Sequence, residues 1–259
     1  HASRFCTNIF VLDNGSTDGT WEIVQQVGRE VDAVVPMGSM EGVFYTARPR
    51  IFEEVRDGFD DGDWLLVLDA DEFLETDPRP LLERSRRKGK EIVRSLFAQF
   101  VLTTPDVETE WFESAGPVRG FDELPRHYRI DWEENRFFRY SDRLAWPESD
   151  EDGSIRRSVQ PVGARDVFRE RLLTRHYQYR SRSQMIKRLR IRSGLHESRG
   201  YFRHNAEVDW RQYVQEPSSL KRVEPDGRLE VTWLEALRSR WRREKPLHRL
   251  VRGVRRRLP

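Results

Sequence analysis

An apolar run at Trp64–Leu68 ends directly in the acidic segment Asp69–Glu72, and this junction constrains the fold more than any other feature. Short continuous apolar runs are typical of strands that are buried on both faces of a parallel sheet. Residues that follow such a strand enter the crevice where open α/β folds bind ligands. Asp69 and Asp71, spaced by one residue, offer the oxygen ligands that Mg²⁺ and Mn²⁺ prefer. A solvated acidic turn is the alternative, and the preceding strand favours the metal site.

Strand and helix signals also alternate before this junction. An apolar run at 9–12 ends in the turn signal Asp13-Asn14-Gly15, and Ser16 and Thr17 can cap a helix that ends at Gly28. A second apolar run follows at 31–35, and then a helical stretch at about 42–59. This order predicts right-handed crossovers in one parallel sheet that includes 64–68.

Asp13 and Asn14 therefore stand at the end of a predicted parallel strand, beside a helix N-terminus that favours anions. A capped strand-to-helix turn without a ligand is the alternative interpretation of the same residues.

The remaining two thirds of the chain predict a second series of elements. We expect a helix from Pro78 to Gly89, a strand at 91–102, a loop at 103–125, antiparallel strands within 126–146, a polar loop at 148–153, a basic helix from Ser181 through Ile191 and a helical end from Trp233. Ser181 with Gln184 three residues later forms a capping-box signal.

Composition excludes several classes of protein. The chain has 259 residues, of which 37% are hydrophobic and 11% aromatic, enough for a folded core. No apolar run approaches the roughly 18 residues of a membrane-spanning helix, and nothing resembles a secretory signal. The single cysteine, Cys6, excludes disulfides within the chain and zinc sites built on several thiolates.

The net charge of +2 conceals an uneven distribution. Residues 1–80 carry 17 acidic and 6 basic side chains, whereas residues 233–259 carry 10 basic and 2 acidic ones. An acidic N-terminal third is a poor surface for nucleic acid, so no nucleic-acid partner is expected. The basic end suits an anionic surface.

The run Asp13–Thr20, followed about 50 residues later by 66–72, resembles glycosyltransferase family 2, the inverting nucleotide-sugar transferases. Residues 135–140 and 175–181 resemble later blocks of its bacterial branches more loosely. The match covers roughly residues 8–190. The resemblance implies an α/β fold of the GT-A type, a Rossmann-like, mostly parallel sheet flanked by helices, with a helical basic C-terminal extension. We divide the chain into a GT-A domain at 1–196, lacking its usual N-terminal part, and an Arg-rich extension at 197–259.

The resemblance also implies roles for individual residues. The nucleotide-binding candidates are Asp13, Asn14, Arg48 and Asp69, with Arg50 as a weaker one. The ligands implied for Mn²⁺ or Mg²⁺ are Asp69, Asp71 and His176, and a structural histidine is the alternative at position 176. The candidate general base is Glu148, with Asp150, Glu151 and Asp152 as competitors.

The family begins with a strand and a helix before the block that Asp13 matches. This chain starts at His1, about eight residues before its first predicted strand. A central parallel strand cannot be omitted without exposing its apolar neighbours, so we expect a fragment of a longer protein rather than a sheet without its first member.

The predicted function is metal-assisted transfer of a sugar, with inversion, from a nucleotide-sugar donor to a saccharide or lipid-linked acceptor. An excess of 41 arginines over 5 lysines is typical of a GC-rich bacterial genome, so surface polysaccharide or glycolipid synthesis is expected. Two alternatives remain: a sugar-phosphate nucleotidyltransferase, and a non-catalytic module that binds anions or membranes through its tail. The expected location is cytoplasmic, with peripheral contact between the tail and the inner face of the plasma membrane, where Trp233, Leu237 and Trp241 would insert.

Overall fold

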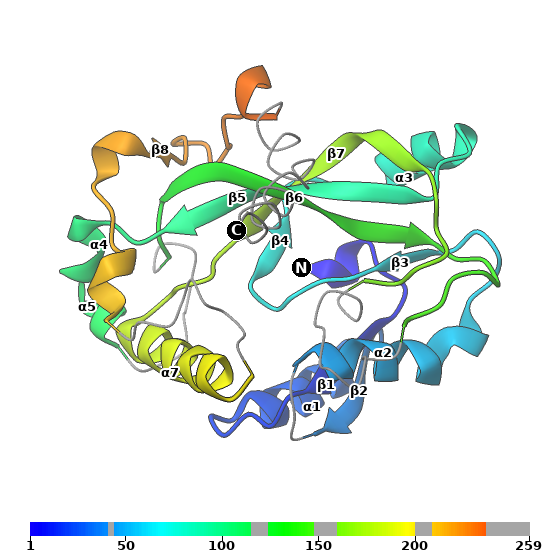
Figure 1. Ribbon diagram of the computed structural model, residues 1–259, viewed down its shortest axis with the longest axis horizontal. Coiled ribbons are helices and arrows are strands. Elements are labelled where there is room, and N and C mark those ends of the chain that lie inside the picture. The colour runs from blue at the N-terminus through cyan, green and yellow to red at the C-terminus, as the bar shows by residue number, and fades with distance from the viewer. Residues whose placement is uncertain (41–43, 115–123, 148–159, 200–208, 237–259) are drawn as a thin grey trace, which may run out of the picture. The chain divides into compact units, whose positions relative to one another are not determined.

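The computed structural model describes residues 1–40, 44–114, 124–147, 160–199 and 209–236 (Figure 1). The chain forms two compact units, each assembled from separate segments. The first unit comprises His1–Leu68, Phe73–Arg94 and Asn135–Leu172, and the second comprises Asp69–Glu72, Ser95–Glu134 and Leu173–Pro259.

Helices and strands follow one another throughout the described residues. The first unit contains η1 (Ala2–Arg4), β1 (Ile9–Asp13), α1 (Thr20–Glu30), β2 (Val34–Ser39), α2 (Phe44–Val55), η2 (Arg56–Gly58), β3 (Trp64–Leu66) and α3 (Arg79–Arg87). The strands β4 (Glu72–Leu74), β5 (Ile92–Val101), β6 (His127–Arg139) and β7 (Val167–His176) contribute residues to both units. The second unit adds α4 (Thr104–Val107), α5 (Glu110–Glu113), α7 (Arg182–Arg199), η5 (Trp210–Tyr213), η6 (Pro217–Ser219) and β8 (Lys221–Arg222).

The strands form two sheets. β1 and β2 pair in parallel, from Ile9 opposite Val34 to Asp13 opposite Ser39. The larger sheet has the order β3-β6-β5-β7-β4, with β8 also paired to β6. The prediction of an α/β protein is thereby confirmed.

The prediction that residues 64–68 continue the parallel sheet is wrong. β3 runs antiparallel to β6, with Leu65 opposite Phe138 and Leu66 opposite Phe137. Cross-strand contacts between aromatic and aliphatic side chains stabilise such a pairing, and the described pairings are accordingly mixed rather than mostly parallel.

The first unit has two clusters of buried apolar side chains. One contains Phe52, Val67, Ile92, Phe138, Tyr140, Leu144 and Trp146. The other contains Leu74, Leu81, Leu82, Val93, Phe137, Phe168 and Leu172, through which α3 packs on the sheet. Val67, which follows β3, is therefore buried, as its apolar run predicts.

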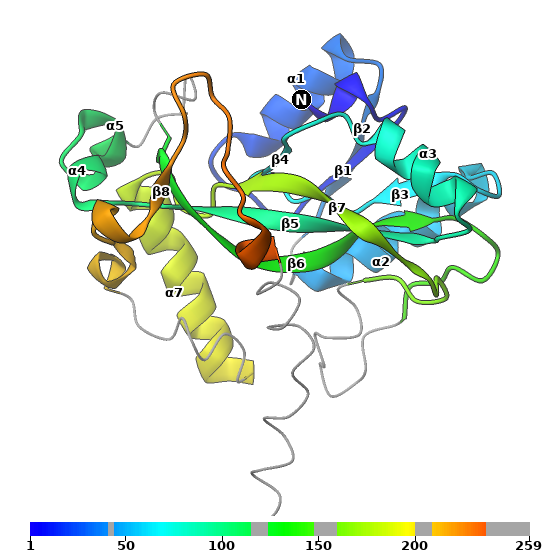
Figure 2. The same cartoon turned by 90° about the horizontal axis from the view of Figure 1, so that it is seen from above.

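In the second unit, α7 lies beside α5 and η5 (Figures 1 and 2). Met185 and Leu189, both fully buried, lie on its inner face, and Met185 packs against Leu102, Phe112 and Tyr179. Ser181 caps the helix as predicted, because its hydroxyl accepts a hydrogen bond from the Gln184 N–H at 3.3 Å. The return bond differs from a capping box, since Gln184 Oε1 accepts from the Arg180 N–H at 3.3 Å.

Several local predictions need correction. α1 begins at Thr20 with Gly19, at φ 82°, as its N-cap residue, rather than after Ser16 or Thr17. Glycine adopts this left-handed conformation without the steric cost that a side chain adds. The predicted loop at 103–125 contains the short helices α4 and α5, and the strand signals at 126–146 form one long strand, β6.

The helical end begins as predicted, with residues 233–236 in helical conformation. The Thr232 hydroxyl accepts a hydrogen bond from the Glu235 N–H, and the Glu235 carboxylate accepts one from the Thr232 N–H. Leu237 and Trp241 lie outside the described residues. Within the part of the chain that the structure describes, no helix has the length and apolarity needed to cross a membrane.

Tyr128 connects β6 to the C-terminal segment, and this connection is testable. Its hydroxyl accepts a hydrogen bond from the Glu230 N–H at 2.6 Å and donates one to the Glu230 carbonyl at 3.1 Å, while its ring is fully buried. Replacing Tyr128 with phenylalanine is expected to lower the free energy of unfolding by about 1 kcal/mol, because both backbone groups lose this partner. Urea denaturation followed by circular dichroism measures the change, and an unchanged midpoint and slope would contradict it.

Candidate functional site

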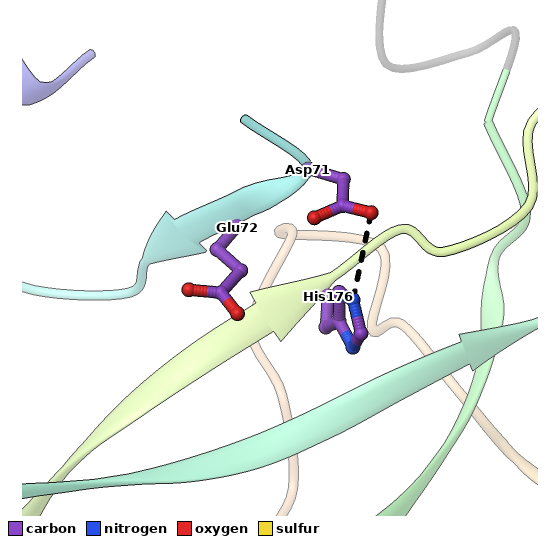
Figure 3. A group of neighbouring side chains, drawn as sticks. All are labelled: Asp71, Glu72 and His176. Carbon is purple, nitrogen blue, oxygen red and sulfur yellow. Dashed lines mark ion pairs between the residues drawn. The ribbon is translucent and has the colours of Figure 1, made fainter. Parts of the chain in front are cut away.

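Three side chains of the second unit form a group that could hold a metal ion: Asp71, Glu72 and His176 (Figure 3). One ligand atom from each lies within 4.8 Å of the others. Glu72 and His176 are buried, and Asp71 is partly buried. We call these residues the Asp–Glu–His group.

Backbone hydrogen bonds fix the acidic residues of this group. The Glu72 N–H donates to the Asp69 carbonyl at 3.0 Å, and the Asp69 N–H donates to Glu72 Oε2 at 3.2 Å. The Tyr177 N–H donates to the Asp71 carbonyl at 2.9 Å. The acidic turn is therefore tied both to itself and to the residue that follows β7.

Two aromatic rings hold the imidazole of His176. The ring centroids of Phe97 and Trp132 lie 5.8 and 5.7 Å from that of His176, and both contacts are edge-to-face. Phe97 and Trp132 stack on each other at 5.3 Å. The imidazole is thus oriented by packing, with its Nε2 3.6 Å from Asp71 Oδ2.

The donor set fits a divalent cation. Two carboxylates and an imidazole are all metal ligands in proteins. The nitrogen of His176 that faces Asp71 is Nε2 (Figure 3), so this is the atom that would bind a cation shared with the carboxylates.

Arg188 of α7 also reaches this group. Its Nη1 lies 3.1 Å from Asp71 Oδ2. Burial alone would raise the pKa of the Asp71 carboxyl, but the hydrogen bonds and charges of His176 and Arg188 outweigh burial and hold that pKa well below its usual range. Asp71 is therefore ionised at neutral pH, as a metal ligand must be.

The structure confirms that Asp71 and His176, far apart in the sequence, lie together. Asp69 is not a member of the Asp–Glu–His group, although its backbone contacts Glu72. Glu72 was not among the predicted ligands. The signal that could have identified it is its position directly between Asp71 and the apolar pair Phe73-Leu74.

The nucleotide-binding candidates other than Asp69 lie in the first unit. Asp13 is buried at the end of β1, Asn14 is exposed, and Arg48 and Arg50 lie in α2. Asp13 Oδ2 accepts hydrogen bonds from the Ser16 N–H at 2.9 Å and from the Ser39 hydroxyl at 2.7 Å. The Ser39 bond joins the ends of β1 and β2, and the Ser16 bond closes the turn after β1, so Asp13 has a structural role whether or not it binds a nucleotide.

The candidate bases cannot be placed in the same way. Glu148, Asp150, Glu151 and Asp152 lie outside the described residues.

The structural role of Asp13 predicts a pH-dependent stability. Burial raises the pKa of the Asp13 carboxyl, but the Ser16 and Ser39 hydrogen bonds outweigh it and lower that pKa below its ordinary value. A lowered folded pKa contributes stability above the unfolded value, about 3.9, and this stability is lost as pH falls through the folded pKa. Replacing Asp13 with asparagine should cost about 1 kcal/mol at pH 7 and less at pH 3.

Urea denaturation of both proteins at several pH values measures this difference. Thr17→Ala, an exposed substitution in the same turn, is the control and should change stability little. If the difference in the free energy of unfolding between Asp13→Asn and the wild type stays constant down to pH 3, the ionised Asp13 carboxylate does not contribute to stability.

The comparisons with known proteins leave the family open. No protein-family model matches the chain, and no curated protein matches it as a relative. The resemblance to glycosyltransferase family 2 consequently rests on the sequence motifs, and any activity assigned to the site is a proposal.

Proposed function

We propose that this chain is an inverting, metal-dependent glycosyltransferase with a GT-A type of fold. One observation carries the proposal: Asp71 and His176, both expected as metal ligands from the sequence motifs, face each other across 3.6 Å in a group that also contains the buried Glu72. A solvated acidic turn, which is the alternative for these residues, does not require a buried histidine beside it.

Different residues of the chain would bind the metal and the nucleotide in such a reaction. A cation, Mn²⁺ or Mg²⁺, held by the Asp–Glu–His group would neutralise the charge on the departing nucleoside diphosphate. The motif resemblance assigns the ribose contact to Asp69 and further nucleotide contacts to Asp13, Asn14 and Arg48. Phe97 and Trp132 fix the imidazole, so the ligand geometry is preorganised.

The transfer step itself needs a base. The acceptor oxygen bonds to the anomeric carbon as the bond from that carbon to the diphosphate oxygen breaks. The proton of the acceptor hydroxyl passes to a carboxylate, for which Glu148 is the candidate, with Asp150, Glu151 and Asp152 as competitors. The acceptor would be a saccharide or a lipid-linked sugar of a bacterial surface polymer or glycolipid.

A panel of nucleotide sugars, assayed with Mn²⁺, with Mg²⁺ and with a chelator, tests this proposal. We expect metal-dependent hydrolysis or transfer with at least one donor, and release of the nucleoside diphosphate is the readout. A sugar-phosphate nucleotidyltransferase would instead release pyrophosphate from a nucleoside triphosphate. If no nucleotide sugar binds and no product forms, glycosyl transfer is excluded as the function of this chain.

A membrane-binding role for the C-terminal segment is supported by a separate observation. Trp233 is 70% exposed, and its neighbour Leu234 is 47% exposed. Exposed tryptophan and leucine ahead of an arginine-rich segment suit the surface of an anionic membrane. Co-sedimentation with vesicles of anionic lipid, comparing the whole chain with Trp233→Ala, tests this role, and equal pelleting would argue against it.

A further inference from the structure

Arg188 and a metal ion would make use of the same carboxylate. Arg188 Nη1 donates to Asp71 Oδ2 at 3.1 Å, and this is the oxygen that faces His176 Nε2. Nη1 also donates to the Gln178 carbonyl at 3.5 Å. The guanidinium group therefore already neutralises the carboxylate that would bind the cation.

The two cations would compete for this oxygen. A divalent cation binds carboxylate oxygens at about 2.0–2.2 Å. A guanidinium group 3.1 Å from the same oxygen would then face a doubly charged ion at close range, in partly buried surroundings where charges are weakly screened. Binding of the cation should accordingly displace Arg188 from Asp71.

The surroundings of Arg188 allow its side chain to move while α7 stays in place. Met185 and Leu189 anchor the helix and are fully buried, whereas the Arg188 side chain is 30% exposed. Its head group therefore has access to solvent, and only side-chain torsions need to change.

A displaced Arg188 would remain close to the bound cation. Its side chain belongs to α7, which Met185 and Leu189 keep in place, and the cation would lie at Asp71, the carboxylate that Arg188 contacts in this structure. A diphosphate bound to that cation carries negative charge, which the released guanidinium group can neutralise through charge-assisted hydrogen bonds.

We propose that Arg188 is an exchangeable cation: it pairs with Asp71 in the metal-free protein, and it binds the diphosphate of the donor once a divalent cation has taken Asp71. This inference rests on the proposed function and adds to it an anion-binding residue on α7. It makes binding of the metal a condition for binding of the diphosphate.

Calorimetric titration of the whole chain with Mn²⁺ alone, and then with inorganic pyrophosphate at saturating Mn²⁺, tests the exchange. Arg188→Gln should bind Mn²⁺ roughly tenfold more tightly, because its competitor is gone, and pyrophosphate roughly tenfold more weakly. Arg190→Gln is the matched control, since Arg190 is an exposed arginine of the same helix. It should match the wild type in both titrations.

The outcomes separate this inference from the proposed function. Unchanged Mn²⁺ affinity in Arg188→Gln overturns the competition, and unchanged pyrophosphate affinity overturns the anion-binding role, while the proposed function stands if the wild type binds Mn²⁺. If neither the wild type nor Arg188→Gln binds Mn²⁺, the proposed function fails as well. Should the glutamine variant not fold, as judged by circular dichroism, Arg188→Met repeats the test with the aliphatic part of the side chain retained.

Discussion

Replacing Asp71 with asparagine is expected to abolish detectable Mn²⁺ binding and to lower metal-dependent transfer by about 10³-fold. Asparagine keeps the shape of the side chain but removes the charge that a divalent cation needs. The Asp71 carboxylate contacts both His176 and Arg188, so its charge acts on two side chains of the site. A 10³-fold loss corresponds to about 4 kcal/mol of transition-state stabilisation.

Asp226→Asn is the control for this experiment. Asp226 is exposed in a loop of the second unit and pairs with Arg228, so its substitution should leave Mn²⁺ affinity and transfer unchanged. Circular dichroism of Asp71→Asn would establish that the fold is retained. Normal metal dependence in folded Asp71→Asn would remove the Asp–Glu–His group from the mechanism.

The sequence predicts part of this site for clear physical reasons. The change from Val67 and Leu68 to the acidic segment marks the point where the apolar run ends, and the candidate carboxylates of Asp69 and Asp71 follow directly. His176 was expected only through the family resemblance, because no local pattern indicates which distant strand end lies beside Asp71. The pairing of these two residues depends on the order of strands in the sheet.

Arg188 shows what the sequence could not indicate. Residues 182–199 contain many basic side chains, and a basic helix is usually a solvated one. Which arginine reaches Asp71 depends on the rotation of α7, and that rotation is set by burial of Met185 and Leu189. A helical period can predict which residues share a face but not which neighbour this face meets.

Local sequence patterns predicted the positions of β5 and α7 better than they predicted which strands pair with each other. The boundaries of β5 lie within one residue of the predicted strand at 91–102, and α7 begins directly after the predicted cap, Ser181. β3 was assigned the wrong neighbours, because its antiparallel partner, β6, lies some 70 residues further along the chain. Phe137 and Phe138 lie opposite Leu66 and Leu65, and such long-range contacts between strands are not visible in a local sequence pattern.

Replacing Phe97 with alanine is expected to lower the free energy of unfolding by about 3–5 kcal/mol and to weaken Mn²⁺ binding in the molecules that remain folded. Phe97 is completely buried in β5, stacks on Trp132 and touches the edge of the His176 ring. Its removal leaves a cavity on one side of the imidazole. The ring would then sample orientations in which Nε2 no longer faces Asp71, and the metal would have to restrict that motion again.

Urea denaturation and Mn²⁺ titration of Phe97→Ala separate the two effects when Phe138→Ala is measured beside it. Phe138 is equally buried but belongs to a core cluster of the first unit, so its loss should cost similar stability without changing Mn²⁺ affinity in the folded protein. Phe97→Leu nearly conserves the volume and supplies the same comparison if the alanine variant does not fold. Equal Mn²⁺ affinity in the Phe97 variants and the wild type would contradict a role of Phe97 in orienting His176 and would leave Trp132 as a described ring that does so.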